Sequence, residues 1–283
     1  MTVGFVGLGN MGGVLAANLV AAGHDVLAHD ALGPRRAPEG SAYAPDVAEV
    51  ARGADVLVLS LPDGTACEQV ARAVLAADDR RVRHVVDTST IGVTAARTLA
   101  ELLAEEKVGY VDAPVSGGVA GARARTLTVM YAGSDDDCDR VAKVLAGLSD
   151  RRHRVGARPG MAQALKLANN FLSATTLAAT SEAIAFGLAA GLDMATMLDV
   201  LNGSSGRSAA TEDKFPGHVL TGRYAAGFTS SLMSKDVQLY LREAGAGAGA
   251  GPIGDAVGAL WERFAQVEPG ADFTRIYPYV AGS

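Results

Sequence analysis

The stretch "TVGFVGLGNMGGVLAANLVAAG", residues 2–23, carries two different patterns in one short segment. Its first six residues form an apolar run of the kind that predicts a buried strand. Residues 11–23 follow with an apolar helical pattern. Between the two patterns, Gly7, Gly9 and Gly12 form the spacing G-x-G-x-x-G. A strand, this glycine spacing and a helix, in that order, predict a loop that binds the pyrophosphate of a dinucleotide.

The glycines of such a loop have separate physical tasks. Gly7 permits a tight turn, Gly9 lets the backbone approach the pyrophosphate, and Gly12 lets the helix pack closely on the strand. The phosphates then face the helix N-terminus, which favours negative charge. Because the chain holds 34 glycines, the spacing alone is weak, and the prediction depends on the strand and helix around it. The loop predicted to bind the cofactor consists of Gly7, Leu8, Gly9, Asn10, Met11 and Gly12.

An acidic residue closes the next predicted strand, residues 25–30. Asp30 lies about 20 residues beyond the glycine loop, where an acid accepts hydrogen bonds from the ribose hydroxyls of NAD and repels the 2′-phosphate of NADP. NAD is therefore the predicted cofactor. Arg35 and Arg36 follow closely, and their guanidinium groups can instead bind a 2′-phosphate, so NADP stays as the alternative.

The first half of the chain alternates strand-like runs with helical patterns. Further strands are predicted over residues 55–62, 83–90, 108–114 and 126–133, and helices over residues 64–76, 93–106 and 135–148. This alternation predicts a mostly parallel, doubly wound sheet with helices on both faces, an α/β Rossmann domain.

The second half, from Gly160 onward, carries helical patterns and no convincing strand. Helices are predicted over residues 164–191, 193–203, 230–246 and 253–267, with Gly203 as a C-cap. Residues 204–230 are rich in Gly, Ser and Thr and predict a loop with short turns, and the repeat "GAGAGAG" (245–251) predicts a helix end that runs into a flexible turn.

The boundary between the halves falls near "RRHRVGARPG" (151–160), which we interpret as a solvated basic surface at the end of the sheet domain. The predicted organisation is a dinucleotide-binding Rossmann domain, residues 1–159, followed by an all-α domain, residues 160–283.

The composition narrows the class of protein. The chain of 283 residues is 49% hydrophobic and 20% charged, enough to bury a substantial core, and its net charge of -6 argues against a nucleic-acid partner.

Cys67 and Cys138 have no metal-ligand spacing and indicate reduced thiols, and the five histidines match no ligand pattern, so no metal is predicted. The N-terminus lacks the basic region of a signal peptide, and no uncharged apolar run has the unbroken character of a membrane span. We therefore predict a cytoplasmic protein that contacts no membrane.

A single lysine stands in the apolar stretch "GMAQALKLANNF" (160–171). Lys166 is the only residue that normally carries charge between Arg158 and Glu182, in a chain that otherwise prefers arginine. An apolar surround lowers the pKa of an ammonium towards the working range, whereas a guanidinium does not deprotonate. An ammonium can stabilise and protonate the alkoxide that forms when hydride adds to a carbonyl, and the neutral amine can remove a hydroxyl proton. We therefore predict that Lys166 is a general acid/base.

Helical spacing places polar residues on the face of Lys166. Asn170 and Ser173 follow at i+4 and i+7, and Gln163 and Asn169 flank them. A solvated helix face would carry several charges, but this face carries amides, hydroxyls and one lysine. At about 3.6 residues per turn, Asn170 lies about 40° from Lys166 around the helix and Asn169 about 60°. Asn170 is thus the amide nearer to the line of Lys166, with Asn169 as the alternative partner.

Four further blocks accompany the glycine loop, namely "DTSTI" (87–91), "DAPVSGG" (112–118), "GMAQALKLANN" (160–170) and "LMSKDVQL" (232–239). In this order and at these separations, over essentially the whole chain, they resemble the β-hydroxyacid dehydrogenase family. The resemblance implies hydride transfer between NAD(P) and a small β-hydroxy acid, such as 3-hydroxyisobutyrate, or the corresponding semialdehyde. It also implies an active site in a cleft between the two domains, and homodimers or homotetramers formed through the helical domain.

The resemblance also implies roles for individual residues. Leu61, Pro62 and Thr90 would line the cofactor site, and Lys235, beside Asp236, would reach the cofactor end of the cleft. Ser116, Gly117 and Gly118 would bind the substrate carboxylate. Lys166 would be the acid/base, and Asn170 would be the neighbour that orients the substrate. The segment 203–211 contains Arg207, a candidate second clamp for the carboxylate. Phe228, further along the chain, is a candidate cover for the cleft.

Three alternatives compete with this interpretation. Imine reductases resemble the fold but replace the lysine with Asp or Tyr, and 6-phosphogluconate dehydrogenase has a much longer helical domain than 283 residues supply. A non-catalytic dinucleotide-binding protein on the same fold would be expected to lose Lys166.

Overall fold

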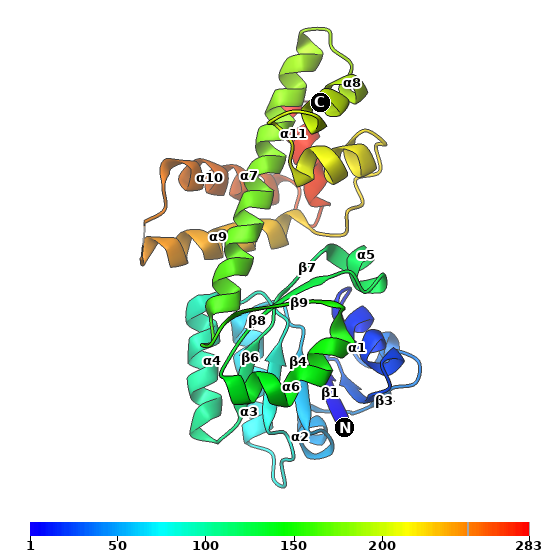
Figure 1. The fold of residues 1–283 in the computed structure, drawn as a ribbon, viewed down its shortest axis with the longest axis vertical. Coiled ribbons are helices and arrows are strands. Elements are labelled where there is room, and N and C mark those ends of the chain that lie inside the picture. Colours follow the sequence, from blue (N-terminus) through cyan, green and yellow to red (C-terminus); the bar gives the residue numbers. More distant parts are fainter. Residues whose placement is uncertain (248, 283) are drawn as a thin grey trace. The chain divides into compact units, whose positions relative to one another are not determined.

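The computed structural model describes residues 1–247 and 249–282, and the chain folds into two compact units, Met1–Lys166 and Leu167–Ser283 (Figure 1). The first unit holds a sheet with strand order β3-β2-β1-β4-β5-β6-β8-β7, and β9 pairs with β8. The strands are β1 (Thr2–Val6), β2 (Asp25–His29), β3 (Ala42–Tyr43), β4 (Val56–Leu59), β5 (His84–Asp87), β6 (Gly109–Asp112), β7 (Val115–Ser116), β8 (Thr128–Ala132) and β9 (Arg151–Gly156).

The sheet is mostly parallel, as predicted. All pairings from β3 to β6 are parallel, β8 runs antiparallel to β6 and β7, and β9 runs parallel to β8. From β1 the chain builds outward to β2 and β3 on one side and then resumes with β4 on the other. The order of the strands thus reverses between β1 and β4, the position where doubly wound sheets bind ligands at the carboxyl ends of their strands.

Helices cover both faces of this sheet, which confirms the predicted Rossmann architecture (Figure 1). They are α1 (Gly12–Ala21), the short 3-10 helix η1 (Pro34–Arg36), α2 (Val47–Gly53), α3 (Gly64–Leu75), α4 (Val93–Glu105), α5 (Gly118–Arg123) and α6 (Asp135–Leu148). Successive side chains of β4 point to opposite faces: Val58 packs in the core of α1 and α6, and Leu57 in the core of α2, α3 and α4. This is why β4 is apolar at every position and does not alternate.

The second unit is helical. The long helix α7 (Met161–Ala189) runs into it and is followed by α8 (Met194–Asn202), the π-helix η2 (Ala210–Val219), α9 (Ser230–Gly245), α10 (Pro252–Val267), the 3-10 helix η3 (Phe273–Arg275) and α11 (Ile276–Ala281). In the described residues of this unit only an isolated bridge, Thr229 to Asp272, pairs as in a sheet, which confirms the predicted all-α character. The core is aromatic, with Trp261 packed against Phe264 and Phe273.

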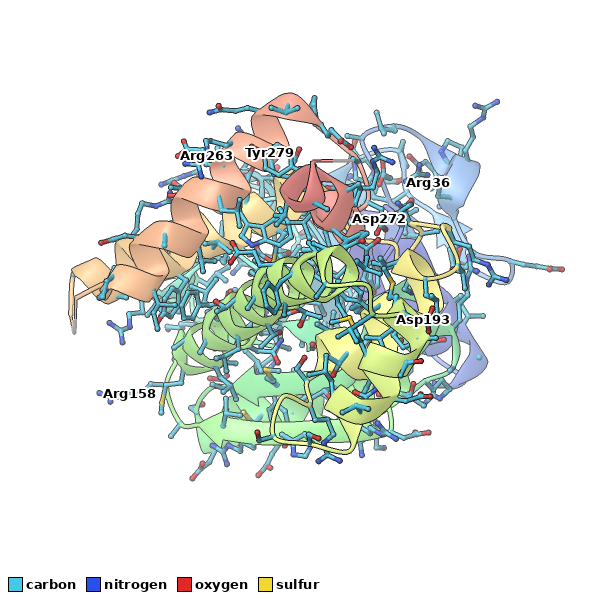
Figure 2. All side chains as sticks on the ribbon, turned by 90° about the horizontal axis from the view of Figure 1, so that it is seen from above. Arg36, Arg158, Asp193, Arg263, Asp272 and Tyr279 are labelled. Carbon is cyan, nitrogen blue, oxygen red and sulfur yellow. The ribbon has the colours of Figure 1, made fainter. Side chains whose placement is uncertain are left out.

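Side-chain caps fix several helix starts in this unit. Asp193 begins α8 by accepting the N–H of Thr196, and Gly203 ends the helix as predicted. Asp272 begins η3 and also accepts the N–H of Gly227 at 2.8 Å; both acids are labelled in Figure 2. The chain between η2 and α9 is thereby tied to the segment that follows α10.

By length and composition alone, α7 is apolar enough to cross a membrane. The expectation from the sequence concerned uncharged apolar runs, and α7 contains Lys166 and Glu182. Core helices of soluble proteins pass the same criterion, so a single helix of this kind is weak support for a membrane protein.

The sequence analysis missed two elements. The basic segment at 151–160 is solvated at Arg151–Arg154, as predicted, but it also contains β9, a strand formed by backbone pairing with β8 that has no apolar pattern. The segment 204–230, predicted to be a loop, contains η2, because Phe215 and Val219 are buried in the helical core despite Pro216 inside the element. Of the predicted turn 245–251, residue 248 lies outside the described residues.

Candidate active site

The glycine loop between β1 and α1 is packed too tightly for side chains at two positions. Gly7 has φ +97°, and a Cβ built on it would lie 2.3 Å from the carbonyl oxygen of Ser60. A Cβ on Gly12 would lie 1.9 Å from the carbonyl oxygen of Gly7. Any side chain at these two positions would force the strand, the turn and the helix apart, because real Cβ atoms do not approach so closely.

Gly9 differs, because a Cβ there would meet no protein atom within 4 Å. The protein's own packing therefore does not require this glycine, and the open space beside its backbone fits a ligand that approaches the main chain. The N-terminus of α1 is also without a side-chain cap in the described structure, whereas Asp46, Asp63 and Ser134 cap other helices of the unit. A helix start without a side-chain cap suits a pyrophosphate.

Asp30 follows β2 and bonds directly to the glycine loop. Its Oδ2 accepts the N–H of Leu8 at 2.5 Å, and its Oδ1 accepts the N–H of Leu32 at 2.8 Å. Each carboxylate oxygen keeps a further lone pair, so these bonds leave room for the predicted bonds to ribose hydroxyls. Arg35 and Arg36 lie exposed in η1, and Arg36 is labelled in Figure 2.

The loops after β4 and β5 are bonded to each other. The N–H of Leu61 donates to Ser89 Oγ at 2.9 Å, and Thr88 Oγ1 donates to the carbonyl oxygen of Leu59 at 2.6 Å. Leu61, Pro62 and Thr90 therefore lie on loops that leave the carboxyl ends of two neighbouring parallel strands, at the same edge of the sheet as the glycine loop.

The segment predicted to bind a carboxylate follows β6 in the chain. Ser116 ends β7, and Gly117 and Gly118 have φ +128° and +65°, a region that few other residues adopt. Gly118 begins α5. Two glycines without Cβ atoms suit a carboxylate that lies close to the main chain, and this role stays a prediction.

Lys166 and Asn170 lie one turn apart on α7 and are both buried, with exposed fractions of 8% and 6%. Asn170 Nδ2 donates to Asp236 Oδ2 at 2.6 Å, and Asn169 Nδ2 donates to Asn170 Oδ1 at 3.1 Å. Asn170 is therefore the amide that is fixed by a buried acid, and Asn169 contacts it from the side.

Asp236 was predicted only as the neighbour of Lys235, but it joins two candidate site residues. Its Oδ1 forms an ion pair with Lys235 Nζ at 3.1 Å while its Oδ2 accepts from Asn170, and its side chain is almost fully buried. The sequence shows that Asp236 adjoins the candidate residue Lys235. Its hydrogen bond with Asn170 could not be predicted, because the two residues are 66 positions apart.

Two acids are buried side by side at the carboxyl ends of β5 and β6. Asp87 and Asp112 are direct neighbours in the strand register. Burial raises the pKa of Asp112 to about 6, although backbone N–H groups of Gln163 and Gly160 act to lower it. Burial also raises the pKa of Asp87, which accepts hydrogen bonds from Tyr110 Oη and the N–H of Ser89. Neither acid was among the site residues predicted from the sequence.

The remaining candidates lie elsewhere in the helical unit. Arg207 is exposed and pairs with Glu212 at 3.7 Å, and Phe228 packs edge-to-face against Phe273 with ring centroids 5.9 Å apart. Across residues 1–247 and 249–282, no group of three or more His, Cys, Asp and Glu is arranged to hold a metal ion.

Comparison with known proteins covers nearly the whole chain. Residues 2–156 match the model of the NAD binding domain of 6-phosphogluconate dehydrogenase, and residues 160–280 match the model described as NAD-binding of NADP-dependent 3-hydroxyisobutyrate dehydrogenase. Both descriptions name a nicotinamide dinucleotide, which agrees with the glycine loop and leaves both NAD and NADP as cofactors.

Full-length relatives carry consistent names. The 3-hydroxyisobutyrate dehydrogenase of Pseudomonas aeruginosa is 35% identical, over 99% of this chain and 98% of its own length. The 2-(hydroxymethyl)glutarate dehydrogenase of Eubacterium barkeri is 35% identical over 86% of this chain and 82% of its own length. The structure of 3-hydroxyisobutyrate dehydrogenase from Mycobacterium tuberculosis with L-serine superposes with a TM-score of 0.90 at 32% identity, covering 99% of this chain and 98% of that one. The chain belongs to the 3-hydroxyisobutyrate dehydrogenase family, within the NAD(P)-dependent β-hydroxyacid dehydrogenases.

Proposed function

We propose that the chain transfers a hydride between NAD(P) and a small β-hydroxy acid, with 3-hydroxyisobutyrate as the first substrate to test, and that Lys166 is its general acid/base. The observation that carries this proposal is the pair of buried polar residues on α7: Lys166, and one turn later Asn170, whose amide is fixed by Asp236. The names of the relatives from Pseudomonas aeruginosa and Eubacterium barkeri support a β-hydroxy acid as the substrate class.

In this proposal different groups act on the substrate carboxylate, on the reacting oxygen and on the transferred hydride. The backbone N–H groups of Ser116, Gly117 and Gly118 bind the carboxylate. Lys166 accepts the hydroxyl proton during oxidation and returns it to the carbonyl oxygen during reduction, and Asn170 orients the substrate beside it. The nicotinamide, when bound, supplies or accepts the hydride.

The cofactor is held by the loops at the carboxyl ends of β1, β2, β4 and β5. The glycine loop binds the pyrophosphate, Asp30 the ribose, and Leu61, Pro62 and Thr90 line the site. Lys235 is proposed as a further cofactor contact, and its ammonium group forms an ion pair with Asp236. Arg207 is proposed as a second contact for the substrate carboxylate, for which it would have to exchange Glu212 as its partner.

The organisation that we propose around this chemistry is the one predicted from the sequence. Residues 1–159 form the dinucleotide-binding domain and residues 160–283 the substrate and oligomerisation domain, which the two family matches support. A homodimer or homotetramer in the cytoplasm is proposed. Support for a reducing compartment comes from Cys67 and Cys138, which are both free and buried thiols.

The experiment is an absorbance assay of the reduced nicotinamide with a panel of short β-hydroxy acids, each with NAD and with NADP. The panel contains 3-hydroxyisobutyrate, 3-hydroxypropionate, serine and 2-(hydroxymethyl)glutarate, and 2-hydroxy acids such as lactate serve as matched controls. Turnover of β-hydroxy acids above the 2-hydroxy acids supports the proposal. Equal turnover of both classes, or none with any β-hydroxy acid, contradicts it.

A further inference from the structure

Gln163 is a buried polar residue that the proposed chemistry does not use. It lies in the first turn of α7, three residues before Lys166, and its side chain is fully buried. Helical spacing predicts that Gln163 flanks the lysine face, but its amide points into the sheet unit. Oε1 accepts the N–H groups of Ile91 at 3.0 Å and Gly92 at 3.2 Å, and Nε2 donates to the carbonyl oxygen of Ser89 at 2.9 Å.

The segment that Gln163 holds is the loop after β5, which contains Thr90. This loop is itself anchored, because the N–H of Ser89 donates to Asp87 Oδ1 at 2.9 Å and Ser89 Oγ accepts the N–H of Leu61 at 2.9 Å. The side chain of Gln163 is therefore bonded to one proposed cofactor loop and, through Ser89, to the other.

The first turn of α7 is fixed from a second side by Asp112. The backbone N–H of Gln163 donates to Asp112 Oδ2 at 3.0 Å, at the end of β6. An anionic acceptor at a helix N-terminus satisfies one of its unpaired N–H groups and is favoured by the helix dipole. Just before the helix, Gly160 has φ +90°, and a Cβ there would lie 3.2 Å from the carbonyl oxygen of Val93. The start of the lysine helix is thus held in one position.

We infer that Gln163 is a positioning residue, whose three side-chain hydrogen bonds hold the first turn of α7 against the Thr90 loop and so fix the ammonium group of Lys166 for proton transfer. Residues at i and i+3 lie on neighbouring parts of a helix face, so a shift of Gln163 is passed on to Lys166. A misplacement of about 1 Å can cost about 10²-fold in rate. This inference rests on the proposed function of Lys166.

A double-mutant cycle in kcat tests the inference. We expect Gln163→Met to lower kcat about 10- to 100-fold, while the KM for the cofactor changes less than about 3-fold. In the Lys166→Ala background, the same substitution should lower kcat less than about 3-fold further, because the group that it positions is already absent. An undiminished loss in that background overturns the role of Gln163. Near-wild-type kcat in Lys166→Ala alone would overturn the proposed function itself, so the two failures are distinguishable.

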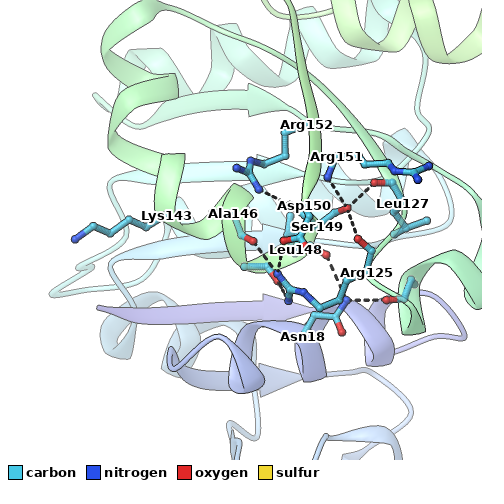
Figure 3. A network of polar contacts seen from close by, with 12 residues as sticks. Asn18, Arg125, Leu127, Lys143, Ala146, Leu148, Ser149, Asp150, Arg151 and Arg152 are labelled. Carbon is cyan, nitrogen blue, oxygen red and sulfur yellow. Dashed lines mark hydrogen bonds and ion pairs between the residues drawn. The ribbon is translucent and has the colours of Figure 1, made fainter.

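Ser149 offers a matched control in the same unit. It is also fully buried, and its Oγ also contacts three backbone groups: it donates to the carbonyl oxygens of Leu127 at 2.5 Å and Arg125 at 3.1 Å and accepts the N–H of Arg151 (Figure 3). We expect Ser149→Ala to lower the Tm but to keep kcat within about 2-fold of wild type. A loss of kcat equal to that of Gln163→Met would show a general effect of destabilisation and would overturn the inference.

A second variant, Gln163→Glu, tests the hydrogen-bond pattern without removing the shape. A protonated glutamic acid can donate to Ser89 and accept from Ile91 and Gly92, but the carboxylate cannot donate. The acids that face this position are Asp112 on β6 and Asp87 on β5. Their negative charges favour the protonated form of a glutamic acid at position 163. We expect kcat of the variant, as a ratio to wild type at the same pH, to rise as the pH falls towards about 5. A ratio that does not change with pH overturns the inference.

Discussion

The glycine loop and the start of α7 are both candidate parts of one active site, but they are built in opposite ways. The loop depends on atoms that are missing: Gly7 and Gly12 have no room for a Cβ, and the space beside Gly9 is open. The region of Lys166 and Asn170 depends on side-chain atoms that are present and buried. The first region should therefore fail when atoms are added and the second when atoms are removed.

The largest effect is expected from removing the ammonium group. Lys166→Ala should lower kcat about 10²- to 10⁴-fold, because the alkoxide loses its proton donor, while binding of NAD(H) is retained. Steady-state kinetics and a fluorescence titration of NADH measure the two properties separately. Lys143→Ala on the exposed side of α6 is the control and should be silent. If the Lys166→Ala variant loses NADH binding in parallel with kcat, the lysine region and the glycine loop do not have separate roles.

Adding one methyl group to the glycine loop should separate its two functions. Gly12→Ala forces a Cβ against the carbonyl oxygen of Gly7 and should lower the free energy of unfolding by about 1–3 kcal/mol. Gly9→Ala should leave the Tm unchanged, since the Cβ meets no protein atom, but weaken NADH binding by about 10-fold or more. Thermal unfolding and NADH titration test the pair. Unchanged NADH affinity in Gly9→Ala would contradict the proposed cofactor site.

The buried acid beneath α7 should give stability a distinct pH dependence. The pKa of Asp112 is raised from 3.8 to about 6, so the folded chain binds its proton more tightly than the unfolded chain does. The resulting contribution is fully present below pH 3.8 and is lost as the pH rises to about 6, on the order of 3 kcal/mol. Asp112→Asn should remove this slope between about pH 4 and 6, as measured by urea unfolding. The same slope in both proteins would assign it to other groups, such as Asp87.

The smallest effect concerns the choice between NAD and NADP. Asp30→Asn removes the charge that repels a 2′-phosphate but can still accept the N–H of Leu8. The preference of kcat/KM for NAD over NADP should fall about 10-fold, which corresponds to about 1.4 kcal/mol. If the wild type already uses NADPH better than NADH, the interpretation of Asp30 is wrong and Arg35 and Arg36 become the candidates.

Local sequence patterns predicted the elements whose own residues carry an apolar or a capping pattern. The apolar run of β4 and the acidic start of α6 are examples, and the structure confirms both elements. Elements held by distant partners could not be predicted in this way. The exposed arginines of β9 carry no apolar pattern, and η2 depends on burial of Phe215 and Val219 against helices far along the chain.

The same limit applies to the candidate site. The isolated lysine and the glycine spacing were visible in single segments, and their roles stay predictions until the experiments above are done. The amide of Gln163 bonds to residues more than 70 positions away, and Asn170 bonds to Asp236 across 66 positions. Helical periodicity could only assign these amides to a face, because the partners that define their roles come from other elements.

The partners of Gln163 also have a consequence for protein engineering. The two family matches meet between residues 156 and 160, whereas the compact sheet unit extends to Lys166. A fragment that ends at residue 159 would leave the N–H groups of Ile91 and Gly92 and the carbonyl oxygen of Ser89 without the amide that satisfies them. The residues that match the first family model, 2–156, are therefore fewer than the residues that should be expressed. A soluble cofactor-binding fragment should also include the first turns of α7.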